Sequence, residues 1–378
     1  MRPPSAPHAL GCIAAAWIAG TCAATPPAAP APPVPSSAQA VLPGVPLRFP
    51  QDFGSHPQFG IEWWYITGWL YTAQHRPLGF QITFFRVRRQ LDAPNPSAFA
   101  PQQILIAHLA LSDPQRGRLW QEQRIRRAGL GLVQAAQGDT DVVADDWRLQ
   151  RQGTGAGSRY LATLQANDFA LQLQLTDPSG PVLNGVQGFS QKGPQPRSAS
   201  YYYSEPHLSV QGSVVRAGHR DSVSGEAWLD HEWASEYLDP AAQGWDWVGL
   251  NLAGGGSLMA FQIRDHRGRR YWAGGTLRDG QGHVQVLSAG QVQFQPLRSW
   301  RSPRSGISYP VAQIVQAGGR SFWLEPLMDN QEFDSRTTSG ALYWEGAVRV
   351  RDGASLNTSP LGEGYLELTG YDRSLSLR

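Results

Sequence analysis

The stretch FALQLQLTDPSG, residues 169 to 180, alternates apolar and polar side chains and then ends in a turn sequence. Side chains of a β-strand point alternately to the two faces of a sheet, so this spacing predicts a strand with one buried face. The Asp-Pro-Ser-Gly sequence supplies the proline and glycine that a tight turn favours. The stretch therefore predicts β-structure with short, hairpin-like connections.

The same alternation recurs along the chain. Further segments of period two that end at turn residues are ILIAHLAL (104–111), YLATLQA (160–166), HLSVQGSVV (207–215), SLMAFQIRD (257–265), ALYWEGAVRV (341–350) and GYLELTGY (364–371). Short strands at regular spacing predict barrels or sandwiches, and hence an all-β fold. The glycine-rich GTGAG at 153–157 lacks a following helical pattern, so the sequence does not predict a dinucleotide site.

The N-terminal residues have the composition of an export signal followed by a tether. Residues 1–24 contain one arginine, an apolar run and then small residues, as a secretory signal peptide does. Residues 25–48 are nearly all Pro, Ala, Ser and Val, which predicts an extended linker outside the fold. We therefore expect a periplasmic or secreted protein. The alternative is a lipoprotein that is anchored through Cys22.

The net charge and the positions of the cysteines argue against nucleic-acid binding and against thiolate chemistry. The formal net charge of +2 is too small to predict binding to nucleic acid. Both cysteines, Cys12 and Cys22, lie in the predicted signal, so we expect neither disulfides nor thiolate metal sites in the mature chain. Lys192 is the only lysine among the 32 Lys and Arg residues. The sequence predicts no cofactor and no metal.

Acidic residues set among tryptophans indicate the candidate site. If AWLDHEW forms a strand, Trp228, Asp230 and Glu232 lie on one face of the sheet. His231 and Trp233 then lie on the other face. One face is therefore acidic, and the other carries imidazole beside indole.

A second carboxyl group, Asp246, lies between Trp245 and Trp247 in the sequence GWDW. Apolar walls remove solvent from a carboxyl group, disfavour its charged form and raise its pKa. Such a group can donate a proton at neutral pH. Asp230 and Asp246 are therefore both candidate general acids.

Four blocks of sequence resemble one known family. The blocks are FPQDFGSHPQFGIEWWYITGWL (49–70), SASYYYSEPHLSVQGSV (198–214), GEAWLDHEW (225–233) and GWDWVGLNLAGGGSLMAFQIR (244–264). Together they are similar to the family that contains carotenoid 1,2-hydratase and the AttH-like proteins, often described as secreted hydrolases. The resemblance implies two tandem lipocalin-like antiparallel β-barrels, with a first domain over residues 49–235 and a second over residues 244–378.

The resemblance also implies an activity that needs no cofactor, the acid-catalysed addition of water to a double bond of a terpenoid or other apolar substrate. Asp230 or Asp246 is then the acid, and His231 is the base for the attacking water or a proton shuttle. Trp233 and Trp245 are expected to stabilise the cation through their aromatic faces.

Further polar groups are expected at the substrate site. Tyr202 and Glu205 in the YYYSEP block and Glu62 in IEWWY are candidate substrate-binding residues. The resemblance has one departure, because hydratases use a tyrosine and an aspartate on the strand where this chain has Phe261 and Asp265.

Other interpretations stay open. The protein could be a non-catalytic carrier for a hydrophobic or lipid-like ligand, in association with a membrane transporter. The acidic and aromatic residues could also form a structural hydrogen-bonded network. A glycosidase could use two of Asp230, Glu232 and Asp246. A serine hydrolase is not predicted because the chain has no GxSxG motif.

Overall fold

The protein is described by a computed structural model over residues 38–88, 103–128, 133–155, 157–236, 238–353 and 359–373. The predicted signal and the first part of the predicted linker lie outside the described residues. Within the described ranges the chain forms strands and the short 3-10 helices η1 (Gln51–Phe53) and η2 (Ala289–Gln291). No helix in these ranges is long and apolar enough to cross a membrane.

The first sheet is built from the N-terminal strands. They are β1 (Ile61–Thr72), β2 (Pro77–Arg88), β3 (Gln103–Asp113), β4 (Arg118–Arg127), β5 (Val133–Ala135), β6 (Asp141–Ala144), β7 (Trp147–Gln152), β8 (Arg159–Gln165), β9 (Phe169–Thr176), β10 (Val182–Leu183), β11 (Phe189–Gln191), β12 (Ala199–Arg216) and β13 (His219–Ala234). Their order in the sheet is β4-β3-β2-β1-β13-β12-β9-β8-β7-β6-β5, with β10 and β11 also paired to β12. The pairings are antiparallel throughout.

The second sheet is built from the C-terminal strands. They are β14 (Ala242–Leu252), β15 (Ser257–Asp265), β16 (Arg270–Arg278), β17 (Val284–Leu287), β18 (Val292–Arg301), β19 (Ser308–Ala317), β20 (Arg320–Pro326), β21 (Glu332–Asp334), β22 (Leu342–Asp352) and β23 (Gly362–Leu368). Their order is β17-β16-β15-β14-β23-β22-β20-β19-β18, with β21 paired to β22, and these pairings are also antiparallel.

The alternation that predicted a strand over residues 169–176 is present in β9. Its phenylalanine and leucine side chains are buried, and its two glutamines are exposed. The turn that follows is stabilised by Asp177, whose Oδ1 accepts hydrogen bonds from the backbone N–H groups of Ser179 (3.0 Å) and Gly180 (2.9 Å). Gly180 has a φ of 78°, which glycine adopts without strain.

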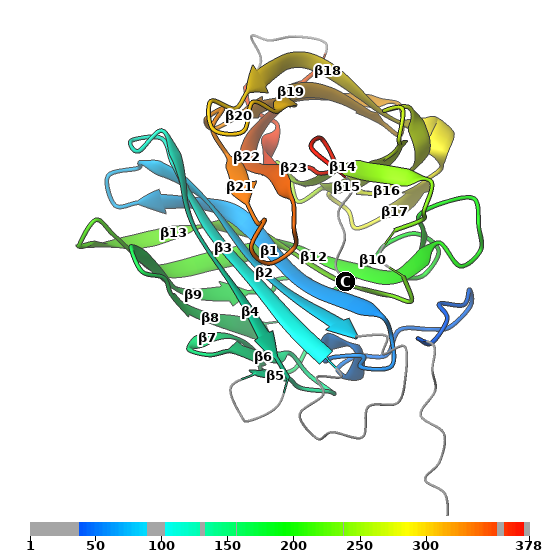
Figure 1. The fold of residues 1–378 in the computed structure, drawn as a ribbon, viewed down its shortest axis with the longest axis horizontal. Coiled ribbons are helices and arrows are strands. Elements are labelled where there is room, and N and C mark those ends of the chain that lie inside the picture. Colours follow the sequence, from blue (N-terminus) through cyan, green and yellow to red (C-terminus); the bar gives the residue numbers. More distant parts are fainter. Residues whose placement is uncertain are drawn as a thin grey trace, which may run out of the picture. The chain divides into compact units, whose positions relative to one another are not determined.

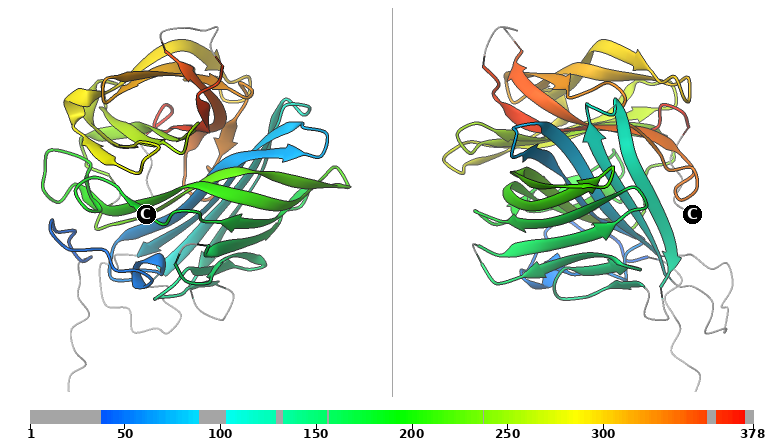
Figure 2. Two further views of the ribbon diagram at one scale, coloured as in Figure 1. Left: turned by 180° about the vertical axis from the view of Figure 1, so that it is seen from behind. Right: turned by 90° about the vertical axis from the view of Figure 1, so that its left-hand side faces the viewer.

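Each sheet curls until its edges approach one another (Figures 1 and 2). In the first sheet, Arg124 on β4 donates a hydrogen bond to the carbonyl of Ala144 on β6 (3.2 Å). In the second sheet, Arg270 on β16 donates to the carbonyl of Val292 on β18 (2.9 Å). The fold is therefore all-β and consists of two tandem lipocalin-like antiparallel barrels, as the sequence predicts.

The three largest of five apolar clusters in the described residues stabilise the two barrels. One fills the first barrel and one fills the second. The third lies between them and combines outward-facing residues of both sheets, including Tyr65, Trp69, Tyr202, Trp228, Trp247, Met259, Phe261 and Tyr365. Burying large aromatic side chains is worth about 1.5 to 3 kcal/mol for each fully buried group, so this third cluster also fixes the barrels to one another.

The last part of the predicted linker differs from an extended tether. Residues 38–48 lie against the first barrel, and Val41 is buried in its core. The backbone N–H of Gln39 donates to the carbonyl of Gln58 (2.9 Å), and that of Val41 donates to Ser235 Oγ (3.1 Å). The structure therefore shows this segment as part of the fold.

Candidate functional site

A cavity of about 110 Å³ lies between the outer faces of the two barrels. Aromatic rings from both sheets form much of its wall, namely Trp63, Tyr65, Phe85, Tyr202, Trp245, Trp247 and Phe261. Asp230, Glu232, Glu367 and Lys192 also line it, and the exposed side chain of Glu236 lies where it reaches solvent. An apolar cavity with a few convergent ionisable groups is typical of a small-molecule site.

Asp230 is the best-enclosed carboxyl group of this cavity. It accepts hydrogen bonds from Tyr202 Oη (2.6 Å), Ser204 Oγ (2.5 Å) and Trp228 Nε1 (2.7 Å). Burial raises the pKa of Asp230 to about 7, and the charge of Glu232 adds to this rise, although the three hydrogen bonds oppose it. Near neutral pH the group is therefore present both as an acid and as a base.

Glu232 lies on the same face of β13 and is bound differently. Its carboxylate accepts a hydrogen bond from Ser200 Oγ and forms an ion pair with Lys192, whose Nζ lies 2.9 Å from Oε1. The ammonium group lies 4.6 Å from the ring centroid of Tyr202 and 4.3 Å from that of Phe261. A cation is therefore already held between a carboxylate and two aromatic faces at the cavity wall.

The third carboxyl group, Glu367, belongs to the second sheet. Burial raises its pKa, and the charges of Asp230 and Glu232 act in the same direction. Its cross-strand partner on β22 is Glu345, whose pKa is raised by burial and by the charge of Glu367. The cavity therefore concentrates carboxyl groups whose protonated forms persist toward neutral pH.

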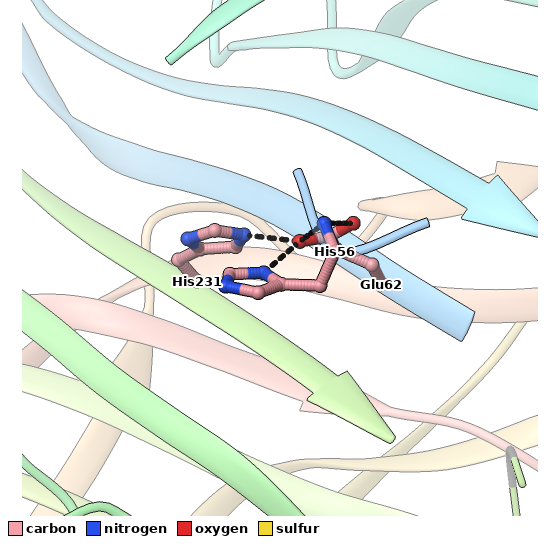
Figure 3. A group of neighbouring side chains, drawn as sticks. All are labelled: His56, Glu62 and His231. Atoms are coloured by element: carbon pink, nitrogen blue, oxygen red, sulfur yellow. Dashed lines mark hydrogen bonds and ion pairs between the residues drawn. The ribbon is translucent and has the colours of Figure 1, made fainter. Parts of the chain in front are cut away.

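His231 points the other way, into the first barrel (Figure 3). The carboxylate of Glu62 lies between the two imidazoles, with Oε1 at 2.7 Å from His56 Nδ1 and 2.9 Å from His231 Nε2. Arg86 Nε donates to the other oxygen (2.7 Å). His56 stacks on Trp233 with ring centroids 3.8 Å apart. These residues form a buried network inside the first barrel.

The pKa values of the two imidazoles are shifted in opposite directions by their surroundings. Both ring nitrogens of His56 face carboxylates, and the hydrogen bonds to Asp52 and Glu62 outweigh burial and raise its pKa. Burial lowers the pKa of His231, whose Nδ1 lies 3.0 Å from the hydroxyl of Tyr203. The surroundings of His56 therefore favour its charged form, and those of His231 favour its neutral form.

Glu62, His56 and His231 could hold a metal by residue type, because a carboxylate and two imidazoles are common ligands. The carboxylate oxygens of Glu62, however, already accept several hydrogen bonds. Glu62 accepts from Arg86, from His56 and His231, and from the backbone N–H of His56 (2.9 Å). Hydrogen bonds from His231 and His56 lower the pKa of Glu62 against the effect of burial. The donor set therefore fits a closed ion-pair network better than a metal site.

This interpretation predicts no stabilisation by metal. Adding zinc chloride or EDTA to the protein should leave its melting temperature unchanged, because a ligand that binds only the folded state would raise it. The measurement is differential scanning fluorimetry. A rise with zinc that is lost in His56→Gln would show that the cluster binds the ion.

Asp246 is also outside the cavity. It faces the interior of the second barrel, where it accepts from Arg264 Nε (3.2 Å), Gln262 Nε2 (2.7 Å) and Tyr371 Oη (2.9 Å). Its neighbour Trp245 faces the opposite way and lines the cavity. The strand therefore places the two residues on opposite faces, as its alternation predicts. Asp246, the second candidate acid, is held in an ion pair with Arg264.

Glu205 is buried inside the first barrel, on the same face of β12 as Tyr203. Burial and the charge of Asp177 raise its pKa to about 8. The pKa of the folded state exceeds the usual value, so stability is highest below the usual pKa and falls as pH rises through about 8.

Glu205→Gln removes this titration and keeps the shape of the side chain. As pH rises from acid to alkaline, the wild type should lose a few kcal/mol of unfolding free energy that the variant keeps. The expected change is ~1.4 kcal/mol for each unit by which the pKa of Glu205 is raised. Urea denaturation at several pH values measures the difference. A constant difference between the two proteins would contradict a buried, neutral Glu205.

The structure divides the predicted site residues into three groups. At the cavity lie Tyr202, Asp230 and Trp245. Inside the first barrel lie Glu62, Glu205, His231 and Trp233. Inside the second barrel lies Asp246. His231 and Asp246 are thus not brought together, because each points into its own barrel.

The cavity residues Lys192, Glu232 and Glu367 were not among the predicted hydratase site residues, although Glu232 was named in the glycosidase alternative. Lys192 carried one signal, since it is the only lysine of the chain. Glu367 carried none, because it is one of several acidic residues in an ordinary alternating strand. Only the pairing of β14 with β23 brings Glu367 beside Trp247 and the cavity.

Known proteins share this sequence pattern and fold. The model of the AttH-like family matches residues 40–371. The crystal structure of an AttH candidate from Nitrosomonas europaea has 51% sequence identity, covers 88% of this chain and 99% of its own, and gives a TM-score of 0.81.

A more distant structure has the same fold. Kievitone hydratase from Nectria haematococca has 15% sequence identity, covers 89% of this chain and 97% of its own, and gives a TM-score of 0.64. A search of curated proteins gives no match.

Proposed function

This chain belongs to the AttH-like family, and on that premise we propose that it binds an apolar molecule between its barrels and adds water across a double bond. The proposed substrate is a terpenoid, such as a carotenoid, or a similar lipid-like compound. Asp230 is the proposed proton donor.

The observation that carries the proposal is the state of Asp230. Protonating a carbon atom needs an acid that keeps its proton near neutral pH in a poorly solvated place. Burial raises the pKa of Asp230 to about 7, and the carboxyl group lines the cavity. The hydroxyl of Tyr202 and the indole N–H of Trp228 stabilise the carboxylate that remains after the proton is given.

The cavity also supports the second half of the reaction. Aromatic faces such as those of Trp245 and Trp247 stabilise a cation by about 0.5 to 2 kcal/mol each. The attacking water needs a base, and Glu232 lines the same cavity as Asp230. His231 is bonded to Glu62 inside the first barrel, so we assign the role of the base to Glu232 instead.

The fold is compatible with this chemistry, since a kievitone hydratase has the same fold at 15% identity. A shared fold does not by itself define an activity, so the proposal rests on the cavity and Asp230. Export of the protein, as residues 1–24 predict, and delivery of its ligand by a membrane transporter are parts of the same proposal.

The proposal is tested with labelled water. The protein is incubated with lycopene, geraniol and geranial in oxygen-18 water, and products are analysed by mass spectrometry. A product that gains one labelled hydroxyl group on carbon supports hydration. Binding without any labelled product, measured by quenching of tryptophan fluorescence, would instead support the non-catalytic carrier.

A further inference from the structure

Lys192 follows β11 directly and reaches the wall of the cavity. Its Nζ lies 2.9 Å from Glu232 Oε1, and it lies over the rings of Tyr202 and Phe261. The side chain is 22% exposed, so the amine is close to the cavity opening and is accessible to a small molecule.

The residue type is informative. The chain has 32 Lys and Arg residues, and its one lysine lies at this cavity. A guanidinium group could form the same ion pair and the same stacking, but it remains protonated and is not a nucleophile. An amine can lose its proton and attack carbon. The position therefore offers a reactivity that arginine would not provide.

We propose that Lys192 forms an imine with the carbonyl carbon of an apolar aldehyde or ketone in the cavity. This inference rests on the proposed function, because it assumes that the apolar ligand occupies the cavity, and it names the ligand class.

Formation of the imine balances in atoms and charge with Lys192 and Glu232 as the reacting groups. Glu232 accepts a proton from the ammonium of Lys192, and the free amine attacks the carbonyl carbon to give a carbinolamine. Protonation of its hydroxyl group and loss of one water molecule give the iminium ion. The sum is one ammonium and one carbonyl giving one iminium and one water, without any oxidant or reductant.

The surroundings of Lys192 suit this exchange, because it leaves the charge of the site unchanged. The carboxylate of Glu232 and the rings of Tyr202 and Phe261, which hold the ammonium, can hold the iminium equally. The cavity therefore need not accommodate a new buried charge, which would be costly.

The iminium would also activate a conjugated double bond toward water. Water adds to the β-carbon as the electron pair of the double bond moves to nitrogen, and Glu232 takes the proton of the water. The resulting enamine receives a proton at its α-carbon. Asp230 can supply it, since its carboxyl group lines the same cavity as Lys192. Hydrolysis of the new iminium then releases a β-hydroxy carbonyl product and Lys192.

The test is reductive trapping. The full-length protein is mixed with geranial, a conjugated terpenoid aldehyde, and sodium cyanoborohydride, and it is analysed by intact mass and peptide mapping. We expect a mass increase equal to geranial less one oxygen atom, located at Lys192. Lys192→Arg should lose the adduct at position 192. Glu232→Gln should lower the rate of adduct formation by about 10²-fold or more, because the amide cannot accept the proton of the ammonium.

Two controls make the outcome decisive. The same trapping in urea measures the reactivity of an exposed lysine, and geraniol competes for the cavity without a carbonyl group. Faster labelling in the folded protein, with protection by geraniol, supports the imine. Labelling that is as slow in the folded protein as in urea would overturn it.

The failure of this inference can be distinguished from that of the proposed function. If geraniol quenches tryptophan fluorescence while Lys192 is not labelled by geranial, the cavity binds apolar molecules and the imine is wrong. If neither compound binds, the proposed apolar site is itself wrong.

Discussion

Asp230→Asn is expected to lower the rate of water addition by about 10²- to 10⁴-fold, the usual effect of losing a general acid. The amide keeps the size of the carboxyl group but has no proton to give. The rate of labelled-hydroxyl formation measures the effect. For the wild type this rate should fall as pH rises through about 7, where burial places the pKa of Asp230.

The same variant should not be less stable than the wild type. Because the pKa of Asp230 is raised in the folded protein, its contribution to stability is complete at acid pH and is lost as pH rises through about 7. Asparagine does not titrate, so Asp230→Asn should be the more stable protein at alkaline pH. A structural network would give the opposite result, a loss of about 1 to 3 kcal/mol from unsatisfied buried partners.

Asp246→Asn is the matched control for Asp230→Asn. It makes the same chemical change on β14, the next strand along the chain, but at a carboxylate that is paired with Arg264 inside the second barrel. We expect a loss of stability and little change in the rate per folded molecule. If Asp246→Asn abolished turnover while Asp230→Asn did not, the assignment of the acid would be reversed.

Arg86→Met is expected to lower the free energy of unfolding by about 3 to 5 kcal/mol, the effect of breaking a buried ion pair from one side. Arg86 is 1% exposed and donates to Glu62 Oε2 (2.7 Å) and to the carbonyl of His56 (2.9 Å). Methionine has a similar length but no donors, so the carboxylate of Glu62 would lose its strongest positive neighbour. Urea denaturation measures the change.

Arg88→Met is the control, two residues further along β2. Its guanidinium donates to the carbonyl of Gln58 (3.0 Å) at an exposed position, where such interactions contribute less than about 1 kcal/mol. Equal losses in the two variants would show that the buried network of Glu62 does not stabilise the first barrel. Turnover measured on the folded fraction should be the same in both, because neither arginine lines the cavity.

Local alternation was readable from the sequence because it depends on successive residues only. The spacing in β13 placed Asp230 opposite His231, and that in β14 placed Asp246 opposite Trp245. Both separations are present in the structure. The all-β fold was predictable for the same reason, whereas the tandem barrels were implied by the resemblance of the four blocks to the family.

The sequence by itself therefore determined which side chains share a strand face, and it singled out Lys192 as the one lysine. Only the tertiary structure decided which face of β13 meets the second barrel, because both faces of the strand carry large apolar side chains that can be buried. Packing β13 and β14 back to back turned Asp230 into the cavity and sent His231 and Asp246 into separate barrels. The pKa of Asp230 follows from that packing, since desolvation depends on neighbours that are distant in the chain.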